Sequence, residues 1–126
     1  MILVDSSVWV GAFNENDTHH KRALTDLEEI KQLGEDIIIT DYVVVEVSNI
    51  LLSRVGKKVS ERFISAMRES NEVTVMFTGE SSFFLTADAF AKNQKALSFV
   101  DVSLIVLVKG LGAKLLTYDE ELRKAL

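Results

Sequence analysis

The sequence predicts a three-layer α/β domain in which a central parallel sheet of about four strands is flanked by helices on both sides. Short apolar runs at residues 2–4, 37–40, 73–77 and 114–117 alternate with longer segments of helical periodicity. Uninterrupted apolar runs are typical of strands buried on both faces, and right-handed helical crossovers join such strands. With 126 residues, of which 48% are hydrophobic, the chain can form one core, and we expect a single domain over residues 1–126.

Two helices are predicted between the first and second strands. Ser6 or Ser7 can cap a short helix that ends at residue 13, and Asp17 or Thr18 can cap the next one. The second helix is expected to end at the glycine in position 34. Its predicted apolar stripe consists of Ala23, Leu24, Leu27, Ile30 and Leu33.

The segment after the strand at 37–40 has two interpretations, because a run of three valines at 43–45 favours a strand by propensity. Helical spacing decides for a helix over residues 42–54, since Val43, Val47 and Leu51 share one face with Ile50. Asp41 is the predicted cap of this helix, and the glycine at position 56 is the predicted stop.

The second half of the chain continues the alternation. Ser60 is predicted to cap a helix that precedes the strand at 73–77, and a helix follows over residues 80–93. A helix over 98–109, the strand at 114–117 and a last helix over 120–126 complete the chain. The side chains expected to face the core are Phe63, Ile64 and Met67 in the first of these helices and Phe83, Phe84, Ala87 and Ala91 in the second.

Four acidic residues lie close to the ends of these elements. Asp5 and Asp119 directly follow strands, Asp101 lies in the first turn of its helix, and Glu46 lies about one turn into its own. Functional groups of an open parallel sheet gather in the crevice beyond the carboxyl ends of the strands. We therefore expect these four carboxylates to meet in one pocket.

Carboxylates that lie this close repel one another unless a cation joins them. Oxygen ligands select Mg²⁺ or Mn²⁺ over zinc, and an acidic cluster can hold two such ions roughly 4 Å apart, one activating water and the other stabilising a leaving oxygen. The predicted chemistry is in-line hydrolysis of a phosphodiester. Each aspartate taken alone could instead cap a helix, whereas Glu46 has no capping role, and its alternative is a solvent-facing position.

Composition limits the other possibilities. The chain has no cysteine, so disulfides and thiolate metal sites are excluded, and its apolar runs are shorter than the roughly 20 residues that span a bilayer. The start of the chain lacks a basic leader, and we expect a cytoplasmic protein with no membrane association. The net charge of −5 argues against broad attraction to nucleic acid but leaves room for a local basic surface. Arg54, Lys57, Lys58 and Arg62 form the densest basic group, either as a solvated turn or as a contact for RNA phosphates.

Several other residues have competing interpretations. His19 and His20 are neighbours, so they cannot bind one metal from a helix as an i, i+4 pair does, and an exposed helix start is expected. Trp9 and Phe13 are spaced for the core or a dimer contact, with base stacking as the alternative.

The sequence resembles the PIN-domain nucleases, and among them the small VapC-type toxins of prokaryotic toxin–antitoxin pairs. Four segments carry the resemblance in order and together span nearly the whole chain: the opening ILVDSSVW with Asp5, Glu46 followed by Asn49, LSFVD ending at Asp101, and LTYD ending at Asp119.

The resemblance implies an endoribonuclease that depends on Mg²⁺ or Mn²⁺, forms a homodimer and is held inactive by a cognate antitoxin whose tail reaches the acidic pocket. By position it makes Asp5, Glu46, Asp101 and Asp119 the catalytic metal ligands. It gives Ser7 and Thr117 a supporting role through their hydroxyl groups.

Two other functions compete with the nuclease. The first is a catalytically inactive PIN-like module that binds RNA or protein, since a fold alone does not establish activity. The second is a receiver-type phosphotransfer domain with one magnesium ion. That function needs a lysine at the end of a strand near the acids, and Lys114 begins its strand.

Overall fold

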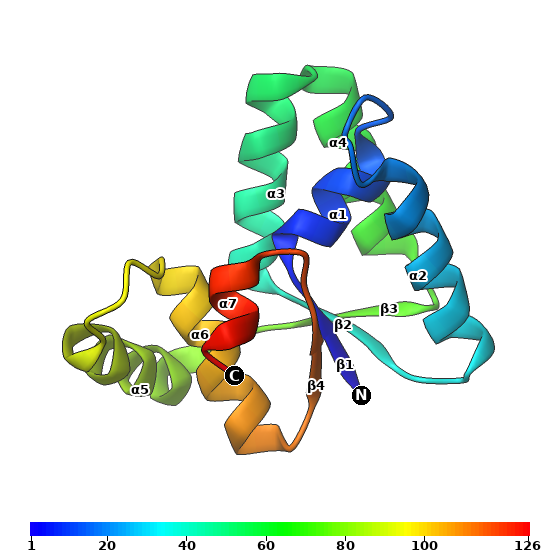
Figure 1. The fold of residues 1–126 in the computed structure, drawn as a ribbon. Helices are drawn as coiled ribbons and strands as arrows, with labels where there is room; N and C mark the ends of the chain where they lie inside the picture. Colours follow the sequence, from blue (N-terminus) through cyan, green and yellow to red (C-terminus); the bar gives the residue numbers. More distant parts are fainter.

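Four parallel strands form the centre of the computed structural model, which describes residues 1–126 (Figure 1). The strands β1 (Ile2–Val4), β2 (Ile37–Thr40), β3 (Val73–Met76) and β4 (Lys114–Leu116) lie in the order β3-β2-β1-β4. In the register of the sheet, Ile2 lies opposite Ile37 on one side and Lys114 on the other. The predicted α/β fold with a parallel sheet of four strands is confirmed.

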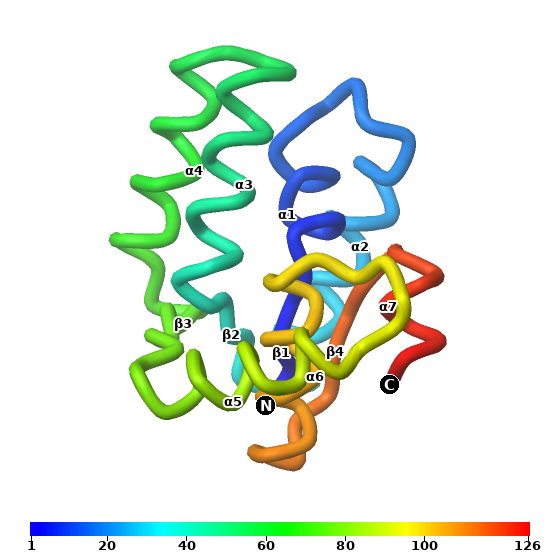
Figure 2. The backbone as a smooth tube through the Cα atoms, turned by 90° about the vertical axis from the view of Figure 1, so that its left-hand side faces the viewer, coloured from blue at the N-terminus to red at the C-terminus, as the bar shows by residue number.

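Helices cover both faces of this sheet. They are α1 (Ser6–Phe13), α2 (His20–Gln32), α3 (Asp41–Arg54), α4 (Lys57–Glu69), α5 (Gly79–Lys92), α6 (Phe99–Leu111) and α7 (Glu120–Lys124). The first four lie on one side of the sheet, and α5 and α6 lie on the other (Figure 1). Figure 2 shows α3 and α4 packed side by side, away from α5 and α6.

The order of the strands creates a switch point between β1 and β4. From β1 the chain moves outward through β2 to β3, and it then returns across the opposite face to β4, on the other side of β1. Ligand sites of such sheets lie at the switch point, beyond the carboxyl ends of the strands. The residues that follow β1 and β4 therefore occupy the position where a site is expected.

The core is built on β1 and β2 and on the helices that cover them. β1 and β2 are buried along their whole lengths, and Phe63 of α4 is fully buried. Its ring lies 6.5 Å from that of Trp9 and 5.2 Å from that of Phe13, measured between centroids. Trp9 and Phe13 thus belong to the core packing, and Trp9, which is 3% exposed, is not placed to stack on a base.

Helix boundaries agree with the prediction except at several starts. The helix predicted to start after Ser60 begins at Lys57, so Ser60 lies inside α4, where its hydroxyl donates to the Ser48 carbonyl at 2.8 Å. Thr40, and not Asp41, caps α3 by accepting a hydrogen bond from Val43. Neither Asp17 nor Thr18 caps α2, which begins after His19, although Asp17 accepts a hydrogen bond from the backbone of His19.

Several apolar residues predicted to face the core are exposed. Leu24 and Leu33 of the α2 region are 49% and 78% exposed, and only Ala23 and Ile30 of the predicted stripe are fully buried. On α5, the inward orientation predicted for Phe83, Phe84 and Ala91 is wrong, because all three are exposed. α5 packs mainly against α6 and leaves most of its aromatic side chains facing outward.

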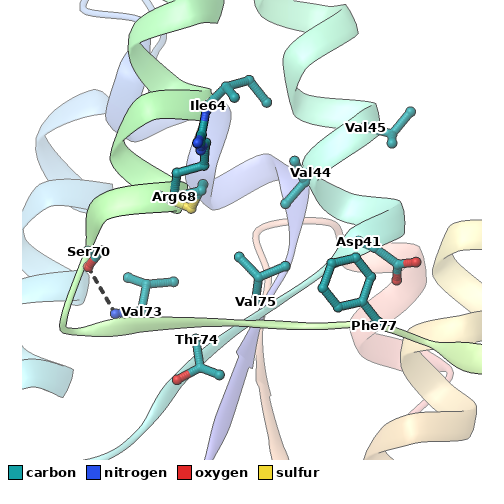
Figure 3. A pocket seen from close by; sticks show the side chains of 11 residues that line it. Asp41, Val44, Val45, Ile64, Arg68, Ser70, Val73, Thr74, Val75 and Phe77 are labelled. Carbon is teal, nitrogen blue, oxygen red and sulfur yellow. Dashed lines mark hydrogen bonds between the residues drawn. The ribbon is translucent and has the colours of Figure 1, made fainter.

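A groove of about 630 Å³ runs along the outer strand β3 between α3 and α4 (Figure 3). Its walls are apolar and include Val44, Ile64 and Val75, and Phe77 lies at one end. None of the four predicted site acids lines this groove, so the groove and the predicted site are separate. None of the helices has both the length and the apolar content needed to cross a membrane.

Candidate functional site

Asp5 is the most buried of the four predicted acids, with 2% of its surface exposed. It follows β1 and occupies the N-cap position of α1, but its side chain makes no capping hydrogen bond. Instead, Oδ2 accepts hydrogen bonds from Thr117 Oγ1 at 2.8 Å and from Ser7 Oγ at 3.0 Å. Oδ1 has only a longer contact of 3.4 Å with Ser6 Oγ. The carboxylate is therefore held by hydroxyl groups on one oxygen, and the other oxygen is nearly free.

The two hydroxyl groups also tie β1 to the segment after β4. The backbone N–H of Tyr118 donates to Ser7 Oγ at 3.0 Å, and that of Asp119 donates to Thr117 Oγ1 at 3.0 Å. Ser7 and Thr117 therefore each accept one hydrogen bond and donate another to Asp5. The structure brings both predicted supporting residues into contact with Asp5.

Glu46 lies on α3 and is partly buried, so the fully solvent-facing alternative does not hold. Burial raises the pKa of its carboxyl, and the charges of Asp5 and Asp101 raise it further, while the Ser6 hydroxyl acts in the opposite direction. An acid whose pKa responds to two other acids lies within their electric field. Glu46 is thus part of one electrostatic group with Asp5 and Asp101.

Asp101 has both a capping role and a place in this group. With Ser98 it forms a capping box at the start of α6, in which its Oδ2 accepts a hydrogen bond from the Ser98 backbone at 3.1 Å. Burial is the main cause that raises its pKa, with contributions from the charges of Asp5 and Asp119, and the bonds from Ser98 oppose the rise. Asp101 therefore connects the buried acids with Asp119.

Asp119 is exposed and caps α7. Its Oδ1 accepts hydrogen bonds from the backbone N–H groups of Glu121 at 2.9 Å and Leu122 at 3.2 Å. The capping alternative weighed for the aspartates is thus realised at Asp119 and, through the capping box, at Asp101. In both residues the cap occupies one carboxylate oxygen and leaves the second available.

None of the four acids has a cationic partner. Every ion pair of the protein involves other acidic side chains. No three histidine or acidic side chains lie close enough together to hold one metal ion as they stand. The possible metal ligands here are carboxylate and hydroxyl oxygens only. Hard divalent cations prefer oxygen ligands of this kind.

The basic group begins about two helical turns beyond Glu46. Arg54 ends α3 eight residues after Glu46, which corresponds to about 12 Å along the helix. Lys57, Lys58 and Arg62 follow on α4, where Lys57 pairs with Glu61. The group surrounds the α3–α4 turn, at the end of α3 that points away from the sheet (Figure 1).

Sequence reasoning missed one cluster beside the site. The Tyr118 hydroxyl donates to Asp26 of α2, and the rings of Tyr118 and His19 lie 4.8 Å apart. His19 is therefore only partly exposed, and His20 is also partly covered, with Nδ1 lying 2.8 Å from the Gly11 carbonyl oxygen. The i, i+4 spacing of Arg22 and Asp26 was the only signal of this cluster in the sequence.

The chain is similar in structure to VapC20 of Mycobacterium tuberculosis, which is described as a toxin that cleaves the sarcin–ricin loop. The match has a TM-score of 0.86 at 20% sequence identity and covers 99% of this chain and 95% of that one. At this identity the likeness establishes the fold. No curated protein sequence matches the chain. The family described as PIN domain matches residues 2–125, almost the full length, and the chain therefore belongs to the PIN domain family.

Proposed function

We propose that the protein is a metal-dependent endoribonuclease that hydrolyses RNA phosphodiester bonds as the toxin of a toxin–antitoxin pair. The observation that carries the proposal is Asp5, a carboxylate that is 2% exposed, lies at the switch point of the sheet and has no cationic partner. A buried charge is normally paired or bound to a metal. Membership of the PIN domain family and the likeness to a toxin described as RNA-loop-cleaving support the same function.

The proposed ligands of Mg²⁺ or Mn²⁺ are Asp5, Glu46, Asp101 and Asp119. When bound, the metal supplies an activated water and neutralises charge on the leaving oxygen. Burial, and to a lesser extent the charges of neighbouring acids, raise the pKa values of Glu46 and Asp101, which supports this assignment because a bound cation, like a proton, offsets a buried negative charge.

The hydrogen bonds of the three aspartates are compatible with metal binding. Ser7 and Thr117 both donate to Oδ2 of Asp5, which leaves Oδ1 with only the longer contact from Ser6. The caps use Oδ2 of Asp101 and Oδ1 of Asp119, so each residue retains one oxygen for a ligand. The chain's own contribution is thus to hold one oxygen of each aspartate in place before substrate arrives.

RNA would reach the acids along α3. Arg54, the first member of the basic group, lies about 12 Å from Glu46 along α3, and the other members follow on α4. Contacts there would hold backbone phosphates without reading sequence. Charge reversal of Lys58 together with Arg62 is expected to weaken RNA binding while leaving Mn²⁺ binding intact.

The proposed protein partners are a second copy of this chain and a cognate antitoxin, and the proposed location is the cytoplasm. Support for the second copy comes from the exposed aromatic side chains Phe83, Phe84 and Phe90 on α5. Beside them, a cavity of about 310 Å³ is lined only by apolar residues, including Tyr42 and Phe99. The antitoxin is proposed from the likeness to the VapC-type toxins.

The test is cleavage of a mixed pool of structured RNAs by the wild type and by D5N and D101N, with Mg²⁺, with Mn²⁺ and with chelator. Asparagine keeps the shape of each side chain and removes the charge that would hold metal. D36N is a matched control. Asp36 is exposed and precedes β2, so it lies at the opposite end of the parallel strands from Asp5, which follows β1. Metal-dependent cutting by the wild type and D36N, but by neither site variant, is the expected result.

The alternative function is a catalytically inactive module that binds RNA or protein. The observation in its favour is that no three acids lie close enough together to hold one metal ion as they stand. Calorimetric titration with Mn²⁺ separates the two functions. Binding that D5N abolishes supports the nuclease, and absence of Mn²⁺ binding together with RNA binding supports the module.

A further inference from the structure

Tyr118 lies between two residues of the candidate site, yet its side chain is held by a helix that carries none of the four acids. Its backbone N–H donates to Ser7 Oγ at 3.0 Å, on the side of Asp5. Its hydroxyl donates to Oδ2 of Asp26 on α2 at 2.7 Å. Neighbouring side chains of an extended segment point in opposite directions, so Thr117 faces Asp5 while Tyr118 faces α2.

The start of α2 encloses the Tyr118 ring. The guanidinium carbon of Arg22 lies 4.4 Å from the ring centroid, and Arg22 Nε lies 3.7 Å from the same Asp26 oxygen that accepts the tyrosine hydroxyl. His19 covers the ring with a centroid separation of 4.8 Å. Tyr118 is only 9% exposed, and both its ring and its hydroxyl have partners of the type that fix a tyrosine in one orientation.

Apart from Leu122 of α7, which is fully buried in the core, the segment that carries Thr117 and Asp119 has few other attachments. β4 has three residues and lies at the edge of the sheet, where it pairs only with β1. α7 has five residues, fewer than a helix needs to be stable without tertiary contacts. The hydrogen bond from Arg123 to the Thr117 carbonyl lies within the same segment and cannot fix its position on the domain.

We propose that Tyr118 is a positioning residue, whose hydrogen bond to Asp26 holds the turn at residues 117–119, which carries Thr117 against Asp5 and places Asp119 directly after β4. This inference rests on the proposed metal-dependent nuclease. Ligands of a metal site must be held within about 0.5 Å of their working positions, so a loosened turn weakens metal binding without any change to the ligands. Tyr118 itself acts through Thr117 and Asp119.

The experiment measures Mn²⁺ binding by calorimetry to the wild type, Y118F, D26A and the double variant. Each single variant removes the same hydrogen bond, and each is expected to raise the dissociation constant for Mn²⁺ about tenfold. The double variant is expected to bind no more weakly than the singles, because the bond is lost only once. Y42F is the matched control, since Tyr42 is the other tyrosine of the chain and lies on α3 against Phe99.

Kinetics then distinguish positioning from general weakening of the fold. At saturating Mn²⁺, Y118F is expected to recover kcat and KM for RNA close to those of the wild type, because excess metal compensates for weaker binding. A loss of activity that no concentration of Mn²⁺ restores overturns the proposal. D26A removes the acceptor of the same hydrogen bond and leaves the tyrosine ring intact, which keeps the test valid if Y118F folds poorly.

The outcomes also separate this inference from the proposed function. Wild-type protein that binds Mn²⁺ and cuts RNA, together with Y118F and D26A that bind Mn²⁺ equally well, overturns the role of Tyr118 and leaves the nuclease standing. Wild-type protein that neither binds Mn²⁺ nor cuts RNA overturns both.

Discussion

Thr117 and Asp5 are 112 residues apart in the chain, and the hydroxyl of Thr117 donates to Oδ2 of Asp5 at 2.8 Å. The bond joins the ends of β4 and β1, the two strands at the switch point of the sheet. Both side chains are buried, at 4% and 2% exposure, so water does not compete for this contact. The pair therefore contributes to stability and also holds the central acid of the candidate site.

Replacement of Thr117 by valine keeps the shape of the side chain and removes both hydrogen bonds of its hydroxyl, the one to Asp5 and the one from the Asp119 backbone. Hydrogen bonds to a charged group contribute about 1.5–3 kcal/mol, so T117V is expected to lower the free energy of unfolding by about 2 kcal/mol. Urea denaturation at neutral pH measures this change. T74V makes the same replacement at an exposed position of β3 and is expected to change stability by less than about 0.5 kcal/mol. Equal stability of T117V and the wild type would contradict the role given to this bond.

The acids of the site also predict how stability depends on pH in the metal-free protein. Burial first, and then the charges of neighbouring acids, raise the native pKa values of Glu46 and Asp101 above their ordinary values. The folded protein therefore holds protons that the unfolded chain has already released, and stability falls as pH rises through the raised native values. Glu35, whose pKa is lowered by the N-terminal amine and Lys114, has the opposite effect and acts only in the acidic range below the ordinary carboxyl values.

Thermal unfolding in chelator is expected to give a higher Tm at about pH 5.5 than at about pH 7.5. In E46Q the difference is expected to shrink, because one of the two groups no longer titrates. E29Q changes an exposed glutamate of α2 and serves as the control. A profile of E46Q that is parallel to that of the wild type would show that Glu46 does not experience the field of the other acids.

Periodicity was sufficient to predict the four strands and most helix boundaries, because it records which face of each element is buried. It could not show which apolar residues at the border of the buried face are exposed to solvent. Leu33 and Phe84 continue apolar stripes, yet they lie where the helix has already turned toward solvent. The cap of α3 could not be predicted from the sequence either. Asp41 instead accepts a hydrogen bond from the hydroxyl of Thr78, which is 37 residues away.

In the candidate site, too, features that depend on neighbouring residues could be predicted, and contacts between distant residues could not. Position after a strand predicts that Asp5 and Asp119 lie at one edge of the sheet, and the structure places both there. The chain alone does not indicate that the Asp119 carboxylate caps α7 or that Tyr118 reaches Asp26, which is 92 residues away. Such pairings depend on the position of each helix along the sheet. The spacing of residues within one element does not determine that position.

The exposed aromatic surface of α5 predicts self-association. Phe83 and Phe84 are 42% and 58% exposed, and their rings pack edge to face with centroids 5.3 Å apart. Rings exposed in this way lose hydration when a second copy covers them, and aromatic residues are enriched in the centres of such interfaces. F84D places a charge in the middle of this surface and is expected to convert a dimer to a monomer in light scattering, with unchanged circular dichroism. L33D introduces the same charge at another exposed apolar residue, at the end of α2, and is expected to leave the dimer intact. A wild-type protein that is monomeric at all concentrations, or an F84D variant that remains dimeric, would place the interface elsewhere or remove it.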